Sequence, residues 1–251
     1  MELTFARQDG KTILQNSYCE VPFKVTRVLH THSPMAHVIL MHSTAGLFGG
    51  DDLQCAIHVG SGAQVRITQQ SATKVHPSED RVAQQRLRVR VEANAELQLF
   101  LEPIIPFAES RLRQQTHLDI AEGATLSYWE GFMTGRVGRG ESWKFRELAS
   151  ETRLTIGGRL SYLDRFHLDS ENPYRSTFAM GTAGHTALGL NVGKHARRIA
   201  SELHDALPDA GVDTLEDTLL IARVVSPDGP HFHHSHETFC GLAAGDGKMQ
   251  P

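Results

Sequence analysis

Histidine is the residue type whose distribution most suggests chemistry. Fifteen of the 251 residues are histidine, and four of them crowd together near the C-terminus. These are His231, His233, His234 and His236, with Cys240 close by. Neutral imidazole is a good ligand for divalent transition metals. The cluster therefore predicts metal binding, either with a physiological role or adventitiously on an exposed tail.

The sequence carries none of the short motifs that mark common enzyme sites. A phosphate-binding Gly-x-x-x-x-Gly-Lys-Ser/Thr loop is absent, since the segment 189–194 has the wrong spacing and continues with His195. There is also no His-Glu-x-x-His, no Gly-x-Ser-x-Gly, and no Gly-x-Gly-x-x-Gly between a strand and a helix. No carboxylates or histidines are spaced as a catalytic dyad. The residues alone predict a mostly-β scaffold with a helical end.

Three glycines within five residues mark an unusual backbone. Gly46, Gly49 and Gly50 indicate either positive φ angles or two segments that pass too closely for a Cβ atom. Asp51 follows directly, where its carboxylate can accept free N–H groups of the turn. The ordinary alternative is a glycine-rich hairpin in a β-protein.

Alternating apolar and polar residues, the pattern of half-buried strands, recur from residue 3 to residue 169. No part of this region has a helical period. One expected strand places Arg86, Arg88 and Arg90 on a single face. Such a stripe would suit an anion, although arginines on one strand face are more often its solvated side.

A weak internal repeat organises these strands. The segments 59–65, 91–97 and 120–126 each run apolar, three turn residues, alanine, polar, apolar. Gly62, Asn94 and Gly123 stand where a left-handed conformation is easiest. A turn that recurs about every thirty residues predicts a mainly-β, β-helix-like (solenoid-like) body of stacked sheets. The alternative is a sandwich whose hairpins share turn chemistry.

Two irregular, charged connections are expected between the coils. In the first, Pro103 and Pro106 exclude a central strand and indicate a fixed extended segment. The second, residues 129–143, places four glycines among two arginines and two glutamates. These arginines and glutamates are expected to pair with one another or to hold backbone carbonyls.

The character of the chain changes after residue 172. Apolar residues at 196, 199, 200, 203 and 207 follow the spacing of an amphipathic helix that stops at Pro208. Residues 219–225 are typical of a buried strand. We therefore divide the chain into a β-rich body, 1–172, and a helix-containing part, 173–251. The Gly- and His-rich end is expected to fray, apart from a short helical turn around Phe239.

Composition excludes several classes of protein. Hydrophobic content of 40% and charged content of 22% are ordinary for a soluble globular chain. A net charge of −4 gives no reason to expect nucleic acid as a partner. Three widely spaced cysteines imply neither a disulfide framework nor a zinc knuckle. With neither a secretion signal nor a membrane span in view, we expect a cytoplasmic protein without a membrane partner.

Four segments together resemble a known family. Residues 46–51, Gly-Leu-Phe-Gly-Gly-Asp, are followed by 68–75, which include Thr73 and Lys74. Residues 103–107 then contain a Pro-x-Ile-Pro-Phe pattern, and Glu130 precedes Gly135-Arg136 and Gly140-Glu141 with Trp143. In this order they resemble the urease accessory protein D family, called H in some bacteria.

The resemblance implies a β-rich stack of sheets that matures urease. Members of the family dock on the urease apoprotein, recruit accessory protein F and the GTPase accessory protein G, and help to pass nickel to the urease active site. No cofactor would be bound tightly, and nickel would be in transit. The missing nucleotide loop agrees with this, because GTP hydrolysis would belong to the partner. The family normally ends in a further helix and a basic terminus with tryptophan, whereas residues 226–251 lack tryptophan.

Nickel in transit needs ligands that hold it weakly, and carboxylates suit this better than a closed cage. Asp51, Glu130, Glu141 and Asp164 lie in or near the family-like segments and are candidates for a transient nickel path. The alternative for each is a turn cap or an ion pair.

An enzyme is the competing hypothesis, because β-solenoids also host carbohydrate-active enzymes along one groove. Asp51, Asp52 and Glu102 would then be the acid and base candidates. The 7% content of Phe, Trp and Tyr offers few rings on which sugars could stack.

Overall fold

The computed structural model describes residues 1–30, 35–169 and 183–245. In chain order its elements are β1 (Glu2–Gln8), β2 (Lys11–Tyr18), β3 (Phe23–Val25), β4 (Ala36–His42), β5 (Asp52–Val59), β6 (Gln64–Gln69), β7 (Thr73–Val75), β8 (Ala83–Val91), β9 (Glu96–Phe100), β10 (Ile104–Pro106), β11 (Arg111–Ile120), β12 (Thr125–Met133), the 3-10 helix η1 (Val137–Arg139), β13 (Glu147–Ile156), β14 (Arg159–Asp169), β15 (His185–Val192), α2 (Ala196–Ala206), β16 (Gly211–Leu215), β17 (Leu219–Ser226) and α3 (Gly229–Ala244).

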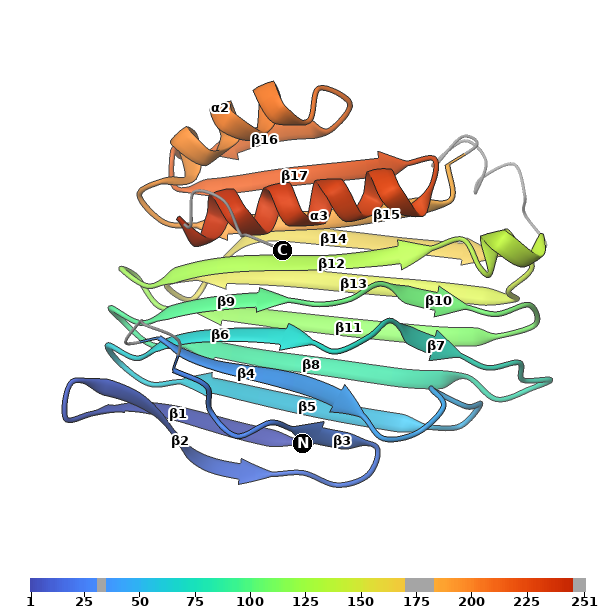
Figure 1. Cartoon of the computed structure of the whole chain (residues 1–251), viewed down its shortest axis with the longest axis horizontal. Helices are drawn as coiled ribbons and strands as arrows, with labels where there is room; N and C mark the ends of the chain where they lie inside the picture. The colour runs from blue at the N-terminus through green and yellow to red at the C-terminus, as the bar shows by residue number, and fades with distance from the viewer. Residues whose placement is uncertain (31–34, 170–182, 246–251) are drawn as a thin grey trace.

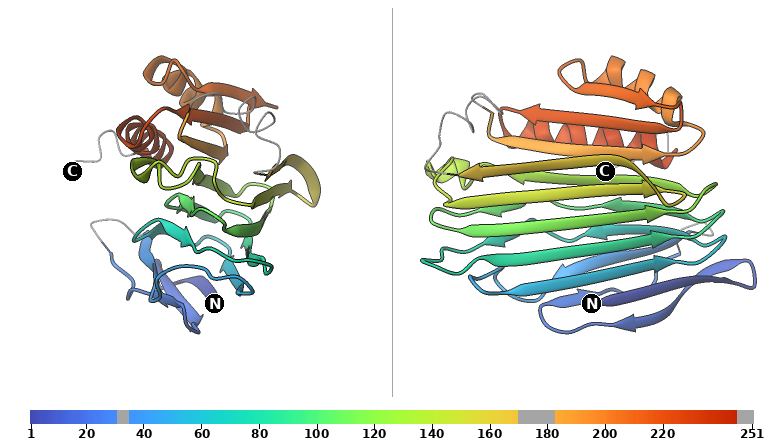
Figure 2. Two further views of the ribbon diagram at one scale, coloured as in Figure 1. Left: turned by 90° about the vertical axis from the view of Figure 1, so that its right-hand side faces the viewer. Right: turned by 180° about the vertical axis from the view of Figure 1, so that it is seen from behind.

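The strands form two sheets that lie face to face (Figure 1). The seven-stranded sheet has the order β14-β13-β11-β8-β5-β1-β2. The ten-stranded sheet has the order β16-β17-β15-β12-β9-β6-β4-β3, with β7 and β10 beside this path. Figure 2 shows both helices on the outer side of the ten-stranded sheet, while none of the described helices covers the seven-stranded sheet.

Three parallel coils build the centre of the fold, as the repeat predicted. Each coil runs from a strand of the seven-stranded sheet through a turn into the ten-stranded sheet: β5 to β6, β8 to β9, and β11 to β12. Gly62, Asn94 and Gly123 have φ angles of 70°, 59° and 76° in the three turns. The alanine after each turn is buried. The stacked-sheet interpretation is therefore confirmed over the sandwich with shared hairpin turns.

Antiparallel strands flank the coils on both sides. At one side β2 pairs with β1, and β3 pairs with β4, in antiparallel fashion. At the other side β14 is antiparallel to β13, and β15 is antiparallel to β12. In each sheet the parallel strands in the middle are therefore flanked at both ends by antiparallel pairs.

Two expectations for the connections need correction. The prolines did not exclude a central strand, because β10 pairs with β7 on one side and with β12 on the other. The Pro103 carbonyl accepts a hydrogen bond from the Thr73 N–H. Ile104 is the residue of β10 that pairs with both β7 and β12, so this pairing does not require an N–H group from proline. Residues 129–133, expected to be irregular, are instead the end of β12.

The predicted frayed tail is wrong over the described residues, because Gly229–Ala244 forms the helix α3. Asp228 caps it by accepting from the His231 N–H, and Gly245 ends it in the left-handed conformation. Phe232 and Phe239 anchor α3 on the ten-stranded sheet with Trp129. The predicted helix and strand before it are confirmed as α2 and β17. The boundary at residue 172 lies outside the described residues, and β15 continues the ten-stranded sheet from β12.

The interior between the sheets contains two apolar clusters. The larger includes Phe5, Val65, Leu97 and Leu126, and the smaller includes Phe132. No helix in the described residues is long and apolar enough to cross a membrane.

Candidate functional site

A band of polar side chains separates the two apolar clusters inside the body. Strand register places Thr116, Thr152 and Asp164 in one row across β11, β13 and β14 of the seven-stranded sheet. Two residues along, Gln114 and Ser150 form a second row with Gln85 of β8. These positions follow the buried leucines of their strands at a spacing of two residues, so their side chains lie on the same inward face. We call this set, with Glu130 and Arg223 opposite, the polar band.

Glu130 of β12 lies at the centre of the polar band and is 4% exposed. Its Oε1 accepts from the Thr152 Oγ1 at 2.5 Å, and its Oε2 accepts from the Gln114 Nε2 at 2.7 Å. Burial raises the pKa of Glu130, and the charge of Asp164 adds to this, while Thr152 and Arg223 act in the opposite direction. The carboxyl is therefore biased toward its neutral form.

Several oxygens in the polar band have no hydrogen-bond partner. They are the Gln85 Oε1, the Gln114 Oε1 and the Thr116 Oγ1. The hydroxyl of Tyr128, two residues before Glu130 on β12, is unpartnered beside the band, and the side chains of Gln114, Thr116 and Tyr128 are at most 5% exposed. The Tyr128 hydroxyl faces Thr116 and Glu130 without reaching normal hydrogen-bond geometry to either. Buried polar groups usually find a partner in protein or in ordered water. This band therefore offers oxygen ligands to a small polar guest.

The polar band reaches the surface at β14 and β17. There the Arg223 guanidinium forms an ion pair with the Asp164 carboxylate, and its Nη2 also approaches the Tyr162 hydroxyl at 3.3 Å. The Arg223 and Asp164 side chains are 37% and 20% exposed. Burial works against the charge on Arg223, but the Asp164 carboxylate outweighs it, so the pKa of Arg223 is raised.

The glycine-rich turn has the special backbone that was expected. Gly46 and Gly50 have φ angles of 141° and 93°. A Cβ atom at Gly49 would collide with the Ser78 Oγ and lie 2.8 Å from the Arg81 carbonyl oxygen. The Asp51 Oδ2 accepts from the Phe48 N–H at 2.8 Å, so this carboxylate caps the turn. The prediction of positive φ and close chain approach is confirmed, and the ordinary hairpin alternative is not needed.

The family-like segments meet at the end of the body where the strands of the ten-stranded sheet lead into loops. The Leu47 N–H donates to the Lys74 carbonyl, and the Thr73 N–H to that of Pro103. A Cβ atom at Gly135 would collide with the Glu141 carbonyl and would lie 3.4 Å from the Pro106 carbonyl oxygen. Segments up to about 100 residues apart in sequence thus share one surface.

Ionic and aromatic contacts hold this end together. Arg136 makes two hydrogen bonds to the Glu141 carboxylate, at 2.7 and 2.5 Å, which confirms the expected pairing. The guanidinium also lies 4.1 Å from the centre of the Phe107 ring, beside a His76 ring that stacks on Phe48. Phe48 is 47% exposed. Glu141 thus fixes the loop through its contact with Arg136. The Arg136 hydrogen bonds also hold the pKa of the Glu141 carboxyl below its usual range.

The four histidines of α3 point in different directions. His231 pairs with Asp228, and His233 pairs with Glu237 at 3.1 Å. His236 faces Trp129, with 5.5 Å between the ring centres, while His234 is exposed. Over residues 1–30, 35–169 and 183–245, no three His, Cys, Asp or Glu side chains are placed to hold a metal ion. Coordination by this helix would therefore require rearrangement.

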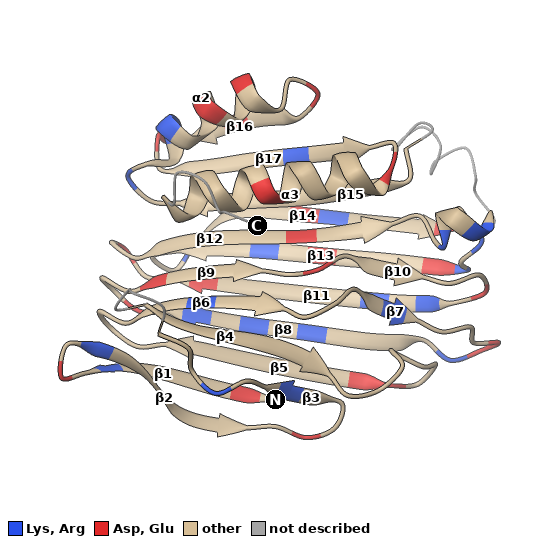
Figure 3. Cartoon of the chain, viewed as in Figure 1, with Lys and Arg blue, Asp and Glu red and all other residues tan. Residues whose placement is uncertain are grey.

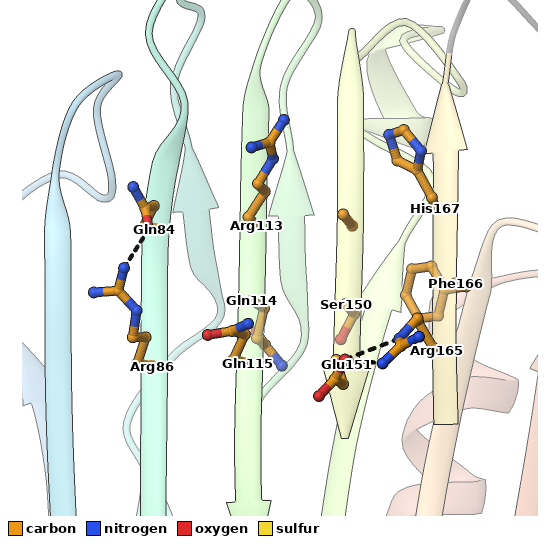
Figure 4. A pocket seen from close by; sticks show the side chains of 11 residues that line it. Gln84, Arg86, Arg113, Gln114, Gln115, Ser150, Glu151, Arg165, Phe166 and His167 are labelled. Atoms are coloured by element: carbon orange, nitrogen blue, oxygen red, sulfur yellow. Dashed lines mark hydrogen bonds and ion pairs between the residues drawn. The ribbon is translucent and has the colours of Figure 1, made fainter. Parts of the chain in front are cut away.

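The outer face of the seven-stranded sheet carries charges in mutual contact. A hollow of about 400 Å³ lies on this face. Figure 4 shows the side chains that line it, among which Arg165 pairs with Glu151 and Arg86 with Gln84. Figure 3 shows the basic residues of β8 and acidic colouring on the neighbouring strand β5. Arg86 of β8 pairs with Asp52 of β5. This neutralisation agrees with the solvated-side interpretation of the stripe.

The enzyme candidates are divided between the two sheets. Asp52 lies on the outer face of the seven-stranded sheet with Arg86. Glu102 follows β9 in the ten-stranded sheet, where burial raises the pKa of its carboxyl and the charge of His233 on α3 opposes that shift. An acid and a base for glycoside hydrolysis must flank a single bond. This arrangement does not favour the carbohydrate-active alternative.

Comparison with known proteins decides the family. The model of the UreD urease accessory protein family matches residues 1–247. The chain belongs to this family. It is 32% identical to the urease accessory protein UreD of Cupriavidus necator, over 90% of this chain and 81% of that protein. It is 32% identical to the protein of that name from Ralstonia nicotianae, over 83% and 72% of the two chains. For the protein from Deinococcus radiodurans the identity is 30%, over 94% and 86%.

The sequence predicted two carboxylates of the polar band but not the residues that surround them. Of the four candidate carboxylates, the structure brings Glu130 and Asp164 together, whereas Asp51 and Glu141 lie in loops at the end of the body. Arg223 was missed, although a lone charge in an otherwise apolar strand was a signal. Gln114 and Thr116 were also missed, and their signal was the polar interruption between Leu112 and Leu118 on the buried face of β11.

Proposed function

We propose that this protein is a urease maturation scaffold that binds the urease apoprotein together with accessory proteins F and G. Membership of the urease accessory family supports the maturation role, and the resemblance of the loop segments supports the named partners. We further propose that nickel crosses the body along the polar band, with Glu130 and Asp164 as its successive carboxylates. The polar band is the observation that carries this part of the proposal.

The chemistry of the polar band suits a metal ion in transit. It offers carboxylate, amide and hydroxyl oxygens, and no thiolate or imidazole that would retain nickel. Glu130 is already engaged by Thr152 and Gln114. Entry of a cation therefore requires these side chains to give way, and the bound metal would be released easily.

Asp51 and Glu141 have a different part in this proposal. Their carboxylates hold the glycine turn and the loop that contains η1, where the family-like segments meet. We infer that they shape the end of the body that faces partner proteins. The exposed Phe48 ring gives this end an apolar contact point.

The test replaces charge in the polar band without changing shape. Glu130→Gln and Asp164→Asn should each lower urease activation in a reconstituted system by about tenfold or more. Both variants should still co-purify with apo-urease and accessory protein F. Glu202→Gln is the matched control, because Glu202 lies on α2, outside the two sheets, and pairs with Arg198 one turn earlier on that helix. Full activation by both band variants would refute the path, and a chain indifferent to both partners would refute the scaffold.

A further inference from the structure

Arg223 lies where the polar band reaches the surface. Glu130 pairs with Leu188 of β15 in strand register, and Leu188 pairs with Arg223 of β17, so Glu130 and Arg223 occupy one row. Asp164 approaches from the opposite sheet, in register with Thr152, which donates to Glu130. The guanidinium thus closes a chain of contacts that begins at the buried carboxyl.

The ion pair of Arg223 with Asp164 is neutral without any guest. Asp164 and Glu130 are the acidic groups, and Arg223 is the cation that interacts with both. The Tyr162 hydroxyl, 3.3 Å from the guanidinium, helps to fix it. A fixed cation beside a carboxylate opposes the arrival of a second cation, since like charges repel strongly where water is scarce.

Unpartnered oxygens face the same region. The Tyr128 hydroxyl is fully buried, faces Glu130 and has no hydrogen-bond partner, and the same holds for the Thr116 Oγ1 in the row of Asp164. Neither atom is hydrogen-bonded to the guanidinium, which contacts Asp164 and Tyr162. They are oxygen ligands available to a cation that has moved past Arg223.

We propose that Arg223 is the resident counter-ion of the polar band and that a divalent cation enters by displacing its guanidinium from Asp164. This inference rests on the proposed nickel path. Arg223 keeps Asp164 neutralised while the band is empty, and it re-forms the ion pair when the cation leaves. It thereby keeps the affinity for the cargo low and its release fast. Exchange of one cation for another also avoids leaving a half-buried carboxylate without a partner.

The experiment measures metal affinity, so that it does not depend on urease. Isothermal titration with Ni²⁺ is carried out on the full chain in which His231, His233 and His234 are replaced by alanine. This background removes exposed imidazoles that would mask binding by the band. Arg223→Gln should tighten Ni²⁺ binding by about tenfold or more, because its loss removes a repulsive charge. Arg223→Lys keeps the charge and should bind as weakly as the background chain.

Two further variants separate failure of this inference from failure of the path. Asp164→Asn should weaken Ni²⁺ binding, and Tyr162→Phe should tighten it slightly, because the guanidinium loses one contact. Tyr162→Phe also replaces Arg223→Gln if the latter does not fold. If Asp164→Asn weakens binding but neither Arg223→Gln nor Tyr162→Phe changes it, the counter-ion role is refuted and the path stands. If none of the variants alters Ni²⁺ binding, both are refuted.

Discussion

His236 makes the stability of the folded chain dependent on pH. Its imidazole is mostly buried against Trp129, and its Nε2 has no hydrogen-bond partner. Burial, with a smaller contribution from the charge of His233, lowers the pKa of His236 from 6.5 to about 4. The unfolded chain therefore binds a proton at this residue at a higher pH than the folded chain does.

The sign and size of the effect follow from this difference. The free energy of unfolding is not reduced by His236 above pH 6.5, where this residue is neutral in both states. It falls as the pH drops from 6.5 toward 4, because the unfolded chain binds the proton first. A shift of that size corresponds to about 3 kcal/mol in total, at 1.36 kcal/mol per pKa unit. By pH 5 the loss amounts to about 2 kcal/mol.

Urea denaturation of the wild type and of His236→Phe, at pH 7.5 and at pH 5, measures this loss. Phenylalanine has a similar shape and no proton to bind, so the variant should lose about 2 kcal/mol less than the wild type on acidification. His234→Phe, at an exposed position of the same helix, is the control and should follow the wild type. Equal losses in the wild type and in His236→Phe would refute the assignment of this pH dependence to His236.

Three further outcomes are expected. Gly49→Val should abolish soluble expression or partner binding, because the side chain would collide with Ser78 and with the Arg81 carbonyl; normal circular dichroism and normal urease activation would contradict this. Gly189→Ala should cost about 1–3 kcal/mol in thermal or urea unfolding, because the new Cβ atom would lie 2.6 Å from the Phe239 ring; an unchanged melting temperature would show that α3 adapts. Replacing the three exposed histidines of α3 (His231, His233 and His234) by alanine should leave urease activation intact while lowering Ni²⁺ binding by the isolated chain. Failed activation would move the metal function to this helix.

The sequence predicted the body of the fold because its signals are local. A turn of four or five residues fixes each coil, and Gly62, Asn94 and Gly123 carry that signal within single segments. The alternation on each strand then determines which side faces inward. Neither step requires knowledge of which strand lies beside which.

The composition of the polar band could not be predicted in the same way. Thr152 and Asp164 become neighbours only through strand pairing, and Glu130 reaches them from the opposite sheet. Arg223 joins from a strand that follows about 60 residues later in the chain. Residue types alone do not contain this register, so Glu130 and Asp164 were found through family resemblance, while Arg223 was not found.

The helix α3 was missed for a different reason. Its buried side consists mainly of Phe232, Phe239 and Cys240, too few apolar residues for a clear helical period. Close packing of these few residues depends on the sheet, where Gly131 and Gly189 have no side chains and so leave space for the Phe232 and Phe239 rings. The cap at Asp228, two residues before a proline, was the local signal that the histidines obscured.

The antiparallel strands on both sides of the coils also determine how far the stack can grow. A run of identical parallel coils has no intrinsic length, and an uncapped edge would let copies of the chain add to one another as in a fibre. Here the end strands interrupt the run of identical parallel coils, and the outer hairpins β1–β2 and β13–β14 each contain a register irregularity, which makes a sheet edge a poorer template for another copy. Duplicating a whole coil, from the start of β8 through β9 and β10 to the residue before β11, would therefore lengthen the stack by about 4.8 Å per sheet without altering either end.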